Sequence, residues 1–324
     1  MLWVVLASAA EVEINAQARP RFEVRNDTFW VSQRTALSGQ LTQGELTVTA
    51  EVRDVRTWGE EENTLKDFSA DGLDIHVGHL SWRGLTVGRQ EFNVHEHRLI
   101  GNVGWTQQGR SFDGARYLRP GVLHVETAGA VLAVDSSAWL AYARAGYGET
   151  NQVDVLYVVD NGDRHTLGIY ALGGTGPLSG RLEAYGQLTD DTTGMVGARG
   201  TYAHERFSVT LWGDALAPGF NTLFATNHKF YGLADIAVFQ IGGPDDGLIN
   251  GALKLAAPVG PAKVGLDGHV FLTPAGDYLG SEGDLTVGVP LAPGLKLGAG
   301  AAVFAHESGD IEGWGFLQLD AKSG

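Results

Sequence analysis

The feature that most constrains this chain is a period of two in its hydrophobicity. In residues 14–25 every even position from Ile14 to Val24 is apolar, and every odd position from Asn15 to Arg25 is polar or charged. Successive side chains of a β-strand point to opposite faces, so this segment predicts a strand with one apolar and one polar face. The same alternation returns in many later segments, among them 46–53, 73–78 and 195–202.

Turn-forming residues separate the alternating runs, for example at 161–163, 293–294 and 308–310. Strands joined by tight turns, with no helical pattern between them, are typical of an antiparallel meander. We count about 16 to 18 strands of roughly 8–13 residues, the size and style of a transmembrane β-barrel. No linker or shift in composition divides the sequence. We therefore expect an all-β protein with short loops, in which residues 11–324 form one antiparallel barrel.

The alternative to a membrane barrel is a large soluble β-sandwich or solenoid. Composition favours the membrane barrel. The mean hydropathy of −0.06 is low for a closed apolar core of this size, but it fits a barrel with a wet interior. Tryptophans near the ends of the runs suggest the aromatic girdles that flank the lipid-facing band of such barrels. These tryptophans are Trp30, Trp58, Trp82, Trp105, Trp139, Trp212 and Trp314.

Other features exclude several classes of protein. Residues 1–10 combine a short apolar run with Ala7-Ser8-Ala9, so we interpret them as a possible truncated signal peptide, or else as an apolar first strand. No apolar run approaches the ~18 residues that a membrane-spanning helix needs. The chain has no cysteine, which excludes a disulfide scaffold. Its net charge of −15 argues against a nucleic-acid partner.

Several blocks of the sequence resemble the alginate-export family of Gram-negative outer-membrane barrels. The blocks are QRTALSG at 33–39, EVRDVRTWG at 51–59, GRQEF at 88–92, RLIGNVGWTQQGRSFDGAR at 98–116 and ATNHKFYGLADI at 225–236. The resemblance implies an 18-stranded barrel in the outer membrane with a polar, charge-lined pore, and the best-known member exports the anionic polysaccharide alginate. This chain departs from the family in being short and in ending LQLDAKSG rather than in a terminal aromatic residue.

In a barrel, the polar face of each strand lines the lumen, where charge tunes selectivity. Arg34 shares this inward face if Leu37 and Leu41 of the same strand face lipid. Arginine binds carboxylates through a planar fork of donors and keeps its charge, so inward arginines could form a track for an anion. They could equally brace the wall through salt bridges. The inward arginines expected on the first three strands are Arg19, Arg21, Arg25, Arg34 and Arg53.

Residues 88–116 form the densest polar, Gly- and Arg-rich block of the chain. The block lacks an apolar stripe of helical spacing, so it predicts the end of one strand, a long loop and the start of the next strand. We expect this loop to fold inward or to lie at the rim, and to narrow the pore. Its candidate pore-lining residues are Arg89, Glu91, Arg98, Arg110, Asp113 and Arg116.

These features predict a passive outer-membrane pore for a charged, mainly anionic solute: a sugar polymer, an oligosaccharide or a small organic anion. The alternative is a structural or plugged barrel that binds rather than conducts. We expect the lipid bilayer as a partner, with possible periplasmic export or uptake partners. The sequence has no G-x-S-x-G motif, and we expect no enzymatic activity. His95-Glu96-His97 is too small a cluster to assign a metal, so we expect no metal and no cofactor.

Overall fold

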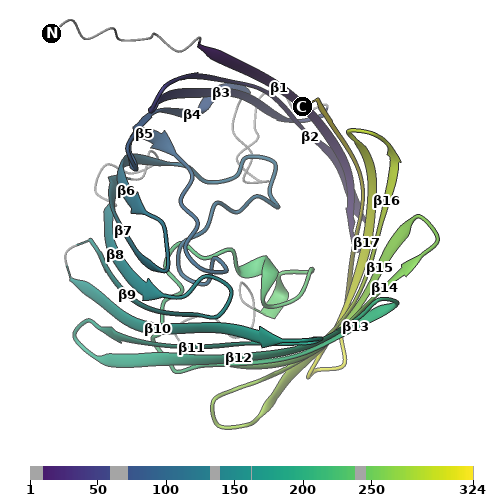
Figure 1. Cartoon of the computed structure of the whole chain (residues 1–324). Helices are drawn as coiled ribbons and strands as arrows, with labels where there is room; N and C mark the ends of the chain where they lie inside the picture. The colour runs from purple at the N-terminus through teal and green to yellow at the C-terminus, as the bar shows by residue number, and fades with distance from the viewer. Residues whose placement is uncertain (1–9, 59–71, 132–138, 162, 238–245, 324) are drawn as a thin grey trace, which may run out of the picture.

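The structure is a computed structural model that describes residues 10–58, 72–131, 139–161, 163–237 and 246–323. The segment interpreted as a signal peptide, 1–10, lies outside the described residues except for its last residue. The described chain forms one closed antiparallel sheet of 18 strands, in which each strand pairs with its neighbours in sequence and β1 also pairs with β18 (Figure 1). This confirms the predicted all-β barrel.

The strands are β1 (Glu11–Arg25), β2 (Thr28–Gln43), β3 (Leu46–Thr57), β4 (Gly72–Trp82), β5 (Leu85–Gln90), β6 (Phe112–Arg119), β7 (Leu123–Val131), β8 (Trp139–Tyr147), β9 (Gln152–Asp160), β10 (Arg164–Thr175), β11 (Leu178–Leu188), β12 (Thr192–His204), β13 (Phe207–Leu216), β14 (Leu248–Val259), β15 (Ala262–Leu272), β16 (Tyr278–Ala292), β17 (Leu295–His306) and β18 (Ile311–Ser323). A short 3-10 helix, η1 (Asn227–Lys229), precedes β14.

The two ends of the barrel differ in the length of their connections. Connections from an even-numbered strand to the next strand are tight, as at Arg83-Gly84 between β4 and β5, where both residues have positive φ (49° and 86°) as a type I′ hairpin requires. Two longer connections lie at the opposite end: residues 91–111 between β5 and β6, and the connection between β13 and β14, of which the structure describes residues 217–237 and 246–247. Outer-membrane barrels have short periplasmic turns and longer extracellular loops, so the termini and the tight turns belong to the periplasmic end.

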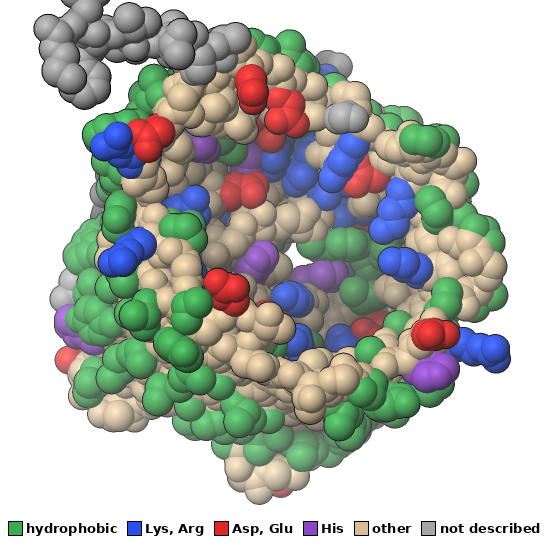
Figure 2. All heavy atoms as spheres, in the orientation of Figure 1, with side chains coloured by type: hydrophobic (Ala, Val, Ile, Leu, Met, Phe, Trp, Pro, Cys, Tyr) green, Lys and Arg blue, Asp and Glu red, His purple; other side chains and the backbone are tan. Residues whose placement is uncertain are grey.

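The alternation of side chains along each strand is as predicted. On β1, Ile14 is 66% exposed whereas Arg19 is 7% exposed, and on β2 Leu37 is 57% exposed whereas Arg34 is 6% exposed. Hydrophobic side chains spread over the outer surface, and charged side chains gather around the lumen (Figure 2). This is the pattern of a barrel whose outer band faces lipid. Among the described residues, no helix is long and apolar enough to cross a membrane.

The prediction of a tryptophan girdle was wrong for four of its seven members. Trp212 and Trp314 are buried inside the barrel, Trp30 packs against the interior cluster, and Trp105 lies on the connection between β5 and β6. Their position near the ends of runs did not reveal which face they occupy, because a barrel with a packed interior also uses large aromatic side chains there. The other three, Trp58, Trp82 and Trp139, are exposed.

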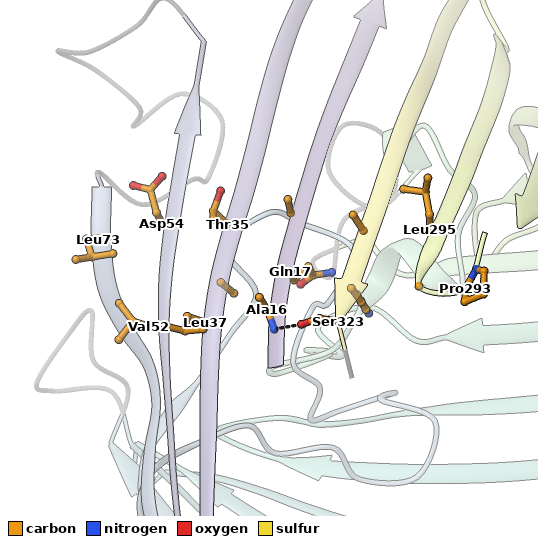
Figure 3. A pocket seen from close by; sticks show the side chains of 15 residues that line it. Ala16, Gln17, Thr35, Leu37, Val52, Asp54, Leu73, Pro293, Leu295 and Ser323 are labelled. Atoms are coloured by element: carbon orange, nitrogen blue, oxygen red, sulfur yellow. Dashed lines mark hydrogen bonds between the residues drawn. The ribbon is translucent and has the colours of Figure 1, made fainter. Parts of the chain in front are cut away.

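The barrel closes where β1 pairs with β18, and the Ala16 N–H donates a hydrogen bond to Ser323 Oγ over 2.9 Å (Figure 3). Small side chains at this seam leave a hollow of about 790 Å³. Leu37 and Leu73, which also line the hollow, are 57% and 73% exposed and belong to the outward apolar face. The hollow therefore faces lipid and is not part of a path through the barrel.

Part of the lumen is filled by two inward-folded connections, which we call the first inner loop (91–111) and the second inner loop (217–237). Apolar side chains of both loops pack on inward side chains of the wall, and Phe92, Ile100, Phe220 and Phe230 are fully buried. Phe92 stacks on Phe112, with the ring centroids 4.9 Å apart. The barrel thus contains a dry hydrophobic core beside its polar interior, and both inner loops are part of that core.

Candidate functional site

The tip of the first inner loop, residues 104–108, is held by arginines of the wall. Arg19 donates to the carbonyl oxygens of Gly104 at 3.0 Å and Thr106 at 2.6 Å, and to Gln107 Oε1 at 2.9 Å. Arg34 donates to the same Thr106 carbonyl at 2.6 Å and also to the carbonyl of Gln107. A guanidinium carries several N–H donors in a fixed plane, so one side chain can bind several carbonyls of a turn.

Arg21 and Arg53 extend this contact on either side. The Arg21 guanidinium donates to the Trp105 carbonyl at 2.9 Å, and its carbon lies 4.6 Å from the Trp105 ring centroid. Arg53 donates to the Gln108 carbonyl, and its Nε donates to Glu51 at 2.8 Å. All four wall arginines are 5–7% exposed. In this structure they contact the loop rather than solvent, and Arg21 and Arg53 also form salt bridges, with Glu23 and Glu51, of the kind that the sequence left open as an alternative to a solute track.

The two inner loops are joined to each other. A β-bridge pairs Ile100 with Phe224, and the Gly101 N–H donates to the Phe224 carbonyl over 2.9 Å. Arg110 donates to the same carbonyl, and burial lowers the pKa of Arg110 to about 10. The Trp105 ring stacks on His228, with centroids 4.6 Å apart. These contacts hold the two inner loops together.

Arg98 fixes the first inner loop to the opposite wall. Its guanidinium donates to Glu183 at 2.8 Å, to Asp214 at 2.7 Å and to Tyr231 Oη at 2.9 Å. Arg98 also lies over the Phe230 ring at 3.6 Å from its centroid. Burial disfavours the Arg98 charge, but its three polar partners outweigh burial and raise the pKa of Arg98 above its usual value. The cation is 1% exposed and fully paired.

The residues of the 95–97 cluster contact different residues of the wall. His95 hydrogen-bonds Asp154 at 3.0 Å, whereas Glu96 accepts from Arg181 at 2.9 Å and from Arg199 at 2.6 Å. Burial acts to raise the pKa of Glu96, but the positive charges of Arg199 and Arg181 prevail and hold it below its usual value. The segment therefore anchors the loop to the wall.

The remaining candidate residues also have partners within the protein. Arg25 donates to the Ala234 carbonyl at 2.9 Å. Burial opposes the negative charge of Glu91, but the hydrogen bond from His76 at 2.8 Å outweighs it and lowers the pKa of Glu91. Two longer ion pairs complete the set: Arg89 with Asp113 at 3.3 Å and Arg116 with Glu126 at 3.9 Å. Whether any of these residues contacts a solute stays a prediction.

An opening remains beside the inner loops, on the side formed by β14–β18 and β1–β3. Figure 2 shows this opening, with Lys and Arg side chains gathered on that side. A hollow of about 350 Å³ there is lined by Lys263, Lys296 and the polar side chains of Thr286 and Gln318, with the rings of Trp105 and Phe316. Asp320 lines it too and accepts a hydrogen bond from Gln17 at 2.9 Å.

Lys263 and Lys296 differ from the arginines of the interior. Among the residues that the structure describes, neither lysine forms an ion pair. The two lie close together, because Lys263 pairs in register with Gly288 and the Lys296 side chain covers Gly288 (Cε 3.1 Å from where a Cβ would stand). Sequence reasoning missed both residues because it concentrated on the arginine-rich first third. Their inward parity on β15 and β17 is the signal that could have found them.

No protein-family model matches the sequence, and no curated protein matches it. Solved outer-membrane proteins match almost the whole chain. OpdK of Pseudomonas aeruginosa, crystallised with vanillate, is 12% identical with a TM-score of 0.76, over 97% of this chain and 98% of that one. OccAB4 of Acinetobacter baumannii is 11% identical with a TM-score of 0.73, over 97% and 98%. OccD3 of Pseudomonas aeruginosa is 11% identical with a TM-score of 0.71, over 96% and 91%.

At this level of identity the likeness shows the fold, which is the 18-stranded barrel of the Occ/OprD outer-membrane porins. Together with the apolar outer band, it confirms the predicted location in the outer membrane of a Gram-negative bacterium.

The resemblance to the alginate-export family was wrong, because the solved structures named above, which match almost the whole chain, are Occ proteins and not alginate-export proteins. The structure gives a physical reason. The blocks 33–39 and 51–59 carry Arg34 and Arg53, which hold the loop tip, and the blocks 88–116 and 225–236 build the inner loops themselves. These blocks fasten loops inside a barrel, and that structural role does not specify a substrate.

Proposed function

We propose that the chain is a passive outer-membrane pore for a small organic anion. The observation that carries this proposal is the pair Lys263 and Lys296, which face the open part of the lumen and form no ion pair with any described residue. An unpaired ammonium group in a channel wall attracts anions, and several of them favour anions over cations. The net charge of −15 does not oppose this, because selectivity depends on the charges that line the path.

Among the solute classes expected from the sequence, a small anion fits better than a sugar polymer. The inner loops take up part of the lumen and leave a limited opening beside them. The hollow at this opening combines two ammonium groups with the rings of Trp105 and Phe316, a set that suits a carboxylate attached to an apolar or aromatic body. OpdK, which shares the fold, was crystallised with vanillate, a small aromatic carboxylate.

In this proposal the wall arginines influence the passage of solute by holding the first inner loop in place. Arg19, Arg21, Arg34 and Arg53 bind the carbonyls at its tip and so set the width of the opening. Their positive charges add to the potential along the same side of the lumen, which keeps the path attractive to anions even where each guanidinium is already bound.

Planar-bilayer recording of the purified barrel tests the proposal. In a KCl gradient the reversal potential should indicate anion preference, and the double variant Lys263→Gln/Lys296→Gln should shift it toward cations. Arg83→Gln is the matched control, since Arg83 pairs with Glu45 at a tight turn on the same end of the barrel and is largely exposed. Cation selectivity of the unaltered barrel, or an unchanged reversal potential in the double variant, would overturn the proposal.

A plugged barrel with a binding role is the second candidate. The observation in its favour is the dry core that both inner loops form with the wall. A plugged barrel would show no conductance in the same recordings, and removal of the loop contacts would unfold it rather than open it.

A further inference from the structure

Four polar side chains form a square on the inner face of the hairpin β15–β16. Asp267 and His269 lie two residues apart on β15 and therefore share a face. Their direct cross-strand partners on β16 are Asp284, opposite Asp267, and Glu282, opposite His269. Direct partners in an antiparallel pair have their Cβ atoms about 4.5–5.5 Å apart. The register thus places an imidazole and three carboxyl groups together inside the barrel.

His269 is oriented with one ring nitrogen free. Its Nδ1 lies 3.1 Å from Asn250 Oδ1, and the Asn250 amide nitrogen donates to the Phe230 carbonyl at 3.1 Å. That second bond fixes Asn250 Oδ1 as the acceptor, so Nδ1 of His269 carries the proton and donates it. Nε2 of His269 is then unprotonated and carries a lone pair that can bind a cation. It is buried, has no hydrogen-bond partner among the described residues, and lies 4.0 Å from Asp284 Oδ2.

The three carboxyl groups of the square outnumber the cations that pair with them. The ammonium of Lys254 lies 2.9 Å from Asp267 Oδ2, and it is the only cation among the described residues that pairs with the three carboxylates. With all three carboxyl groups ionised, one ammonium would leave two negative charges without a counter-ion; in the absence of a metal, a proton held between Glu282 and Asp284, which hydrogen-bond each other, relieves part of this charge. Asp284 is 2% exposed and Glu282 is 3% exposed, and apart from that mutual hydrogen bond one oxygen of each, Oδ1 and Oε2, has no partner in the described structure. Uncompensated buried charge is costly, whereas a bound divalent cation would balance it.

We propose that Asp267, His269 and Asp284 bind a divalent transition-metal cation, with Zn²⁺ as the representative ion. One ligand atom from each residue can be chosen so that all three lie within 4.8 Å of one another. Two ligands each about 2.0–2.2 Å from one ion are at most about 4.4 Å apart, so a small movement of the side chains brings the set to bonding distance. Imidazole nitrogen with carboxylate oxygens is a ligand set that suits Zn²⁺.

Asn250 supports this assignment as a positioning residue. A histidine that binds a metal usually donates its other ring N–H to a carbonyl or carboxylate, which fixes the tautomer and the ring. The Asn250 side-chain oxygen does this for His269. Glu282 lies beside the set, its Oε2 has no hydrogen-bond partner among the described residues other than Asp284, and water or Glu282 would complete the coordination.

The cation would also stabilise the second inner loop. Asp284 accepts the Leu233 N–H at 3.3 Å, and Glu282 accepts the Ala234 N–H at 2.8 Å. Gly232 has positive φ (88°), and a Cβ there would collide with the Glu282 carboxyl group. The loop backbone therefore rests directly on the two acidic side chains that a cation would hold in place.

The test is zinc binding by the full chain, folded in detergent and freed of metal by a chelator. Titration calorimetry with ZnCl₂, with elemental analysis after dialysis, should show one Zn²⁺ per barrel. Co²⁺ at the same stoichiometry should give a d–d absorption spectrum. His269→Ala and Asp284→Asn should each lose the stoichiometric binding. His306→Ala should keep it, because His306 pairs with Glu312 at 2.8 Å and is not among the three ligands.

Folding of each variant is checked by its heat-dependent shift on a gel. Asp267→Asn, which keeps the shape of the side chain, replaces any variant that does not fold. Absence of stoichiometric Zn²⁺ in the unaltered barrel would overturn the proposal, and so would equal binding by the unaltered barrel, the His269→Ala variant and the Asp284→Asn variant.

Discussion

Arg19 and Arg34 lie directly opposite each other on β1 and β2, and both donate a hydrogen bond to the carbonyl oxygen of Thr106 over 2.6 Å. Like charges directly opposite each other destabilise an antiparallel pair. Here the carbonyl oxygens of the loop tip, which are the negative ends of peptide dipoles, offset the repulsion between the two guanidinium groups. The first inner loop is therefore part of what makes this arrangement of the wall stable, and the wall in turn fixes where the loop narrows the lumen.

Arg34→Gln should loosen the tip of the first inner loop. The variant loses hydrogen bonds from a charged donor, each worth about 1.5–3 kcal/mol, and part of this loss is offset because Arg19 no longer faces a like charge. We expect higher and noisier single-channel conductance with only modest loss of stability. Arg56→Gln, on the outer face of β3 beside Asp54, is the control. Unchanged conductance in Arg34→Gln would contradict a role of Arg34 in fixing the tip.

Arg98→Met should be the most destabilising of the interior arginine substitutions. It leaves Glu183 and Asp214 buried with fewer positive partners, and breaking a buried ion pair from one side costs about 3–5 kcal/mol. Both carboxylates have fully buried side chains. Urea unfolding in lipid vesicles would measure the loss. Arg206→Met, at the β12–β13 turn, should unfold at the same urea concentration as the unaltered chain.

Acid should weaken the anchor at Glu96. The pKa of this carboxyl is held below its ordinary value of 4.5, so its pairing with Arg181 and Arg199 contributes stability above about pH 4.5. The contribution is lost as pH falls through the lowered pKa, because the protonated carboxyl no longer attracts the two cations. We expect current noise from loop movement to rise in strongly acidic solution. Glu96→Gln should already be noisy at neutral pH and should lack this acid-dependent increase.

Gly101→Ala should separate the two inner loops. A Cβ at Gly101 would stand 2.6 Å from the Cβ of His97 and would collide with the hydroxyl of Thr226, beside the bridge that joins the loops. The matched control is Gly104→Ala, where the nearest atoms, those of Asn102, are 3.6 Å away or more. Limited proteolysis from the extracellular side should cut the Gly101→Ala barrel faster than the control. Equal rates would show that the interface accommodates the extra methyl group.

The faces of the strands could be read from the sequence, whereas the partners of the inward side chains could not. Alternation in residues 14–25 was enough to place Ile14 outside and Arg19 inside, because the strand repeats every two residues. The polar block at 88–116 was correctly predicted to contain a long loop. Nothing local showed that Trp105 on this loop would stack on His228, more than a hundred residues later in the sequence. The prediction of a tryptophan girdle was wrong for four tryptophans for the same reason.

The sequence by itself determined the strands and their faces: its period of two and its tight turns predict an antiparallel meander, and its composition favoured a membrane barrel over a soluble sandwich or solenoid. Only the tertiary structure decided which lumenal charges are already paired. It binds Arg19 and Arg34 to the loop tip, leaves Lys263 and Lys296 without an ion pair among the described residues, and sets Asp267 opposite Asp284. The physical reason is that alternation follows from the geometry of one strand, whereas pairing depends on strand register and loop packing, which join residues far apart in sequence.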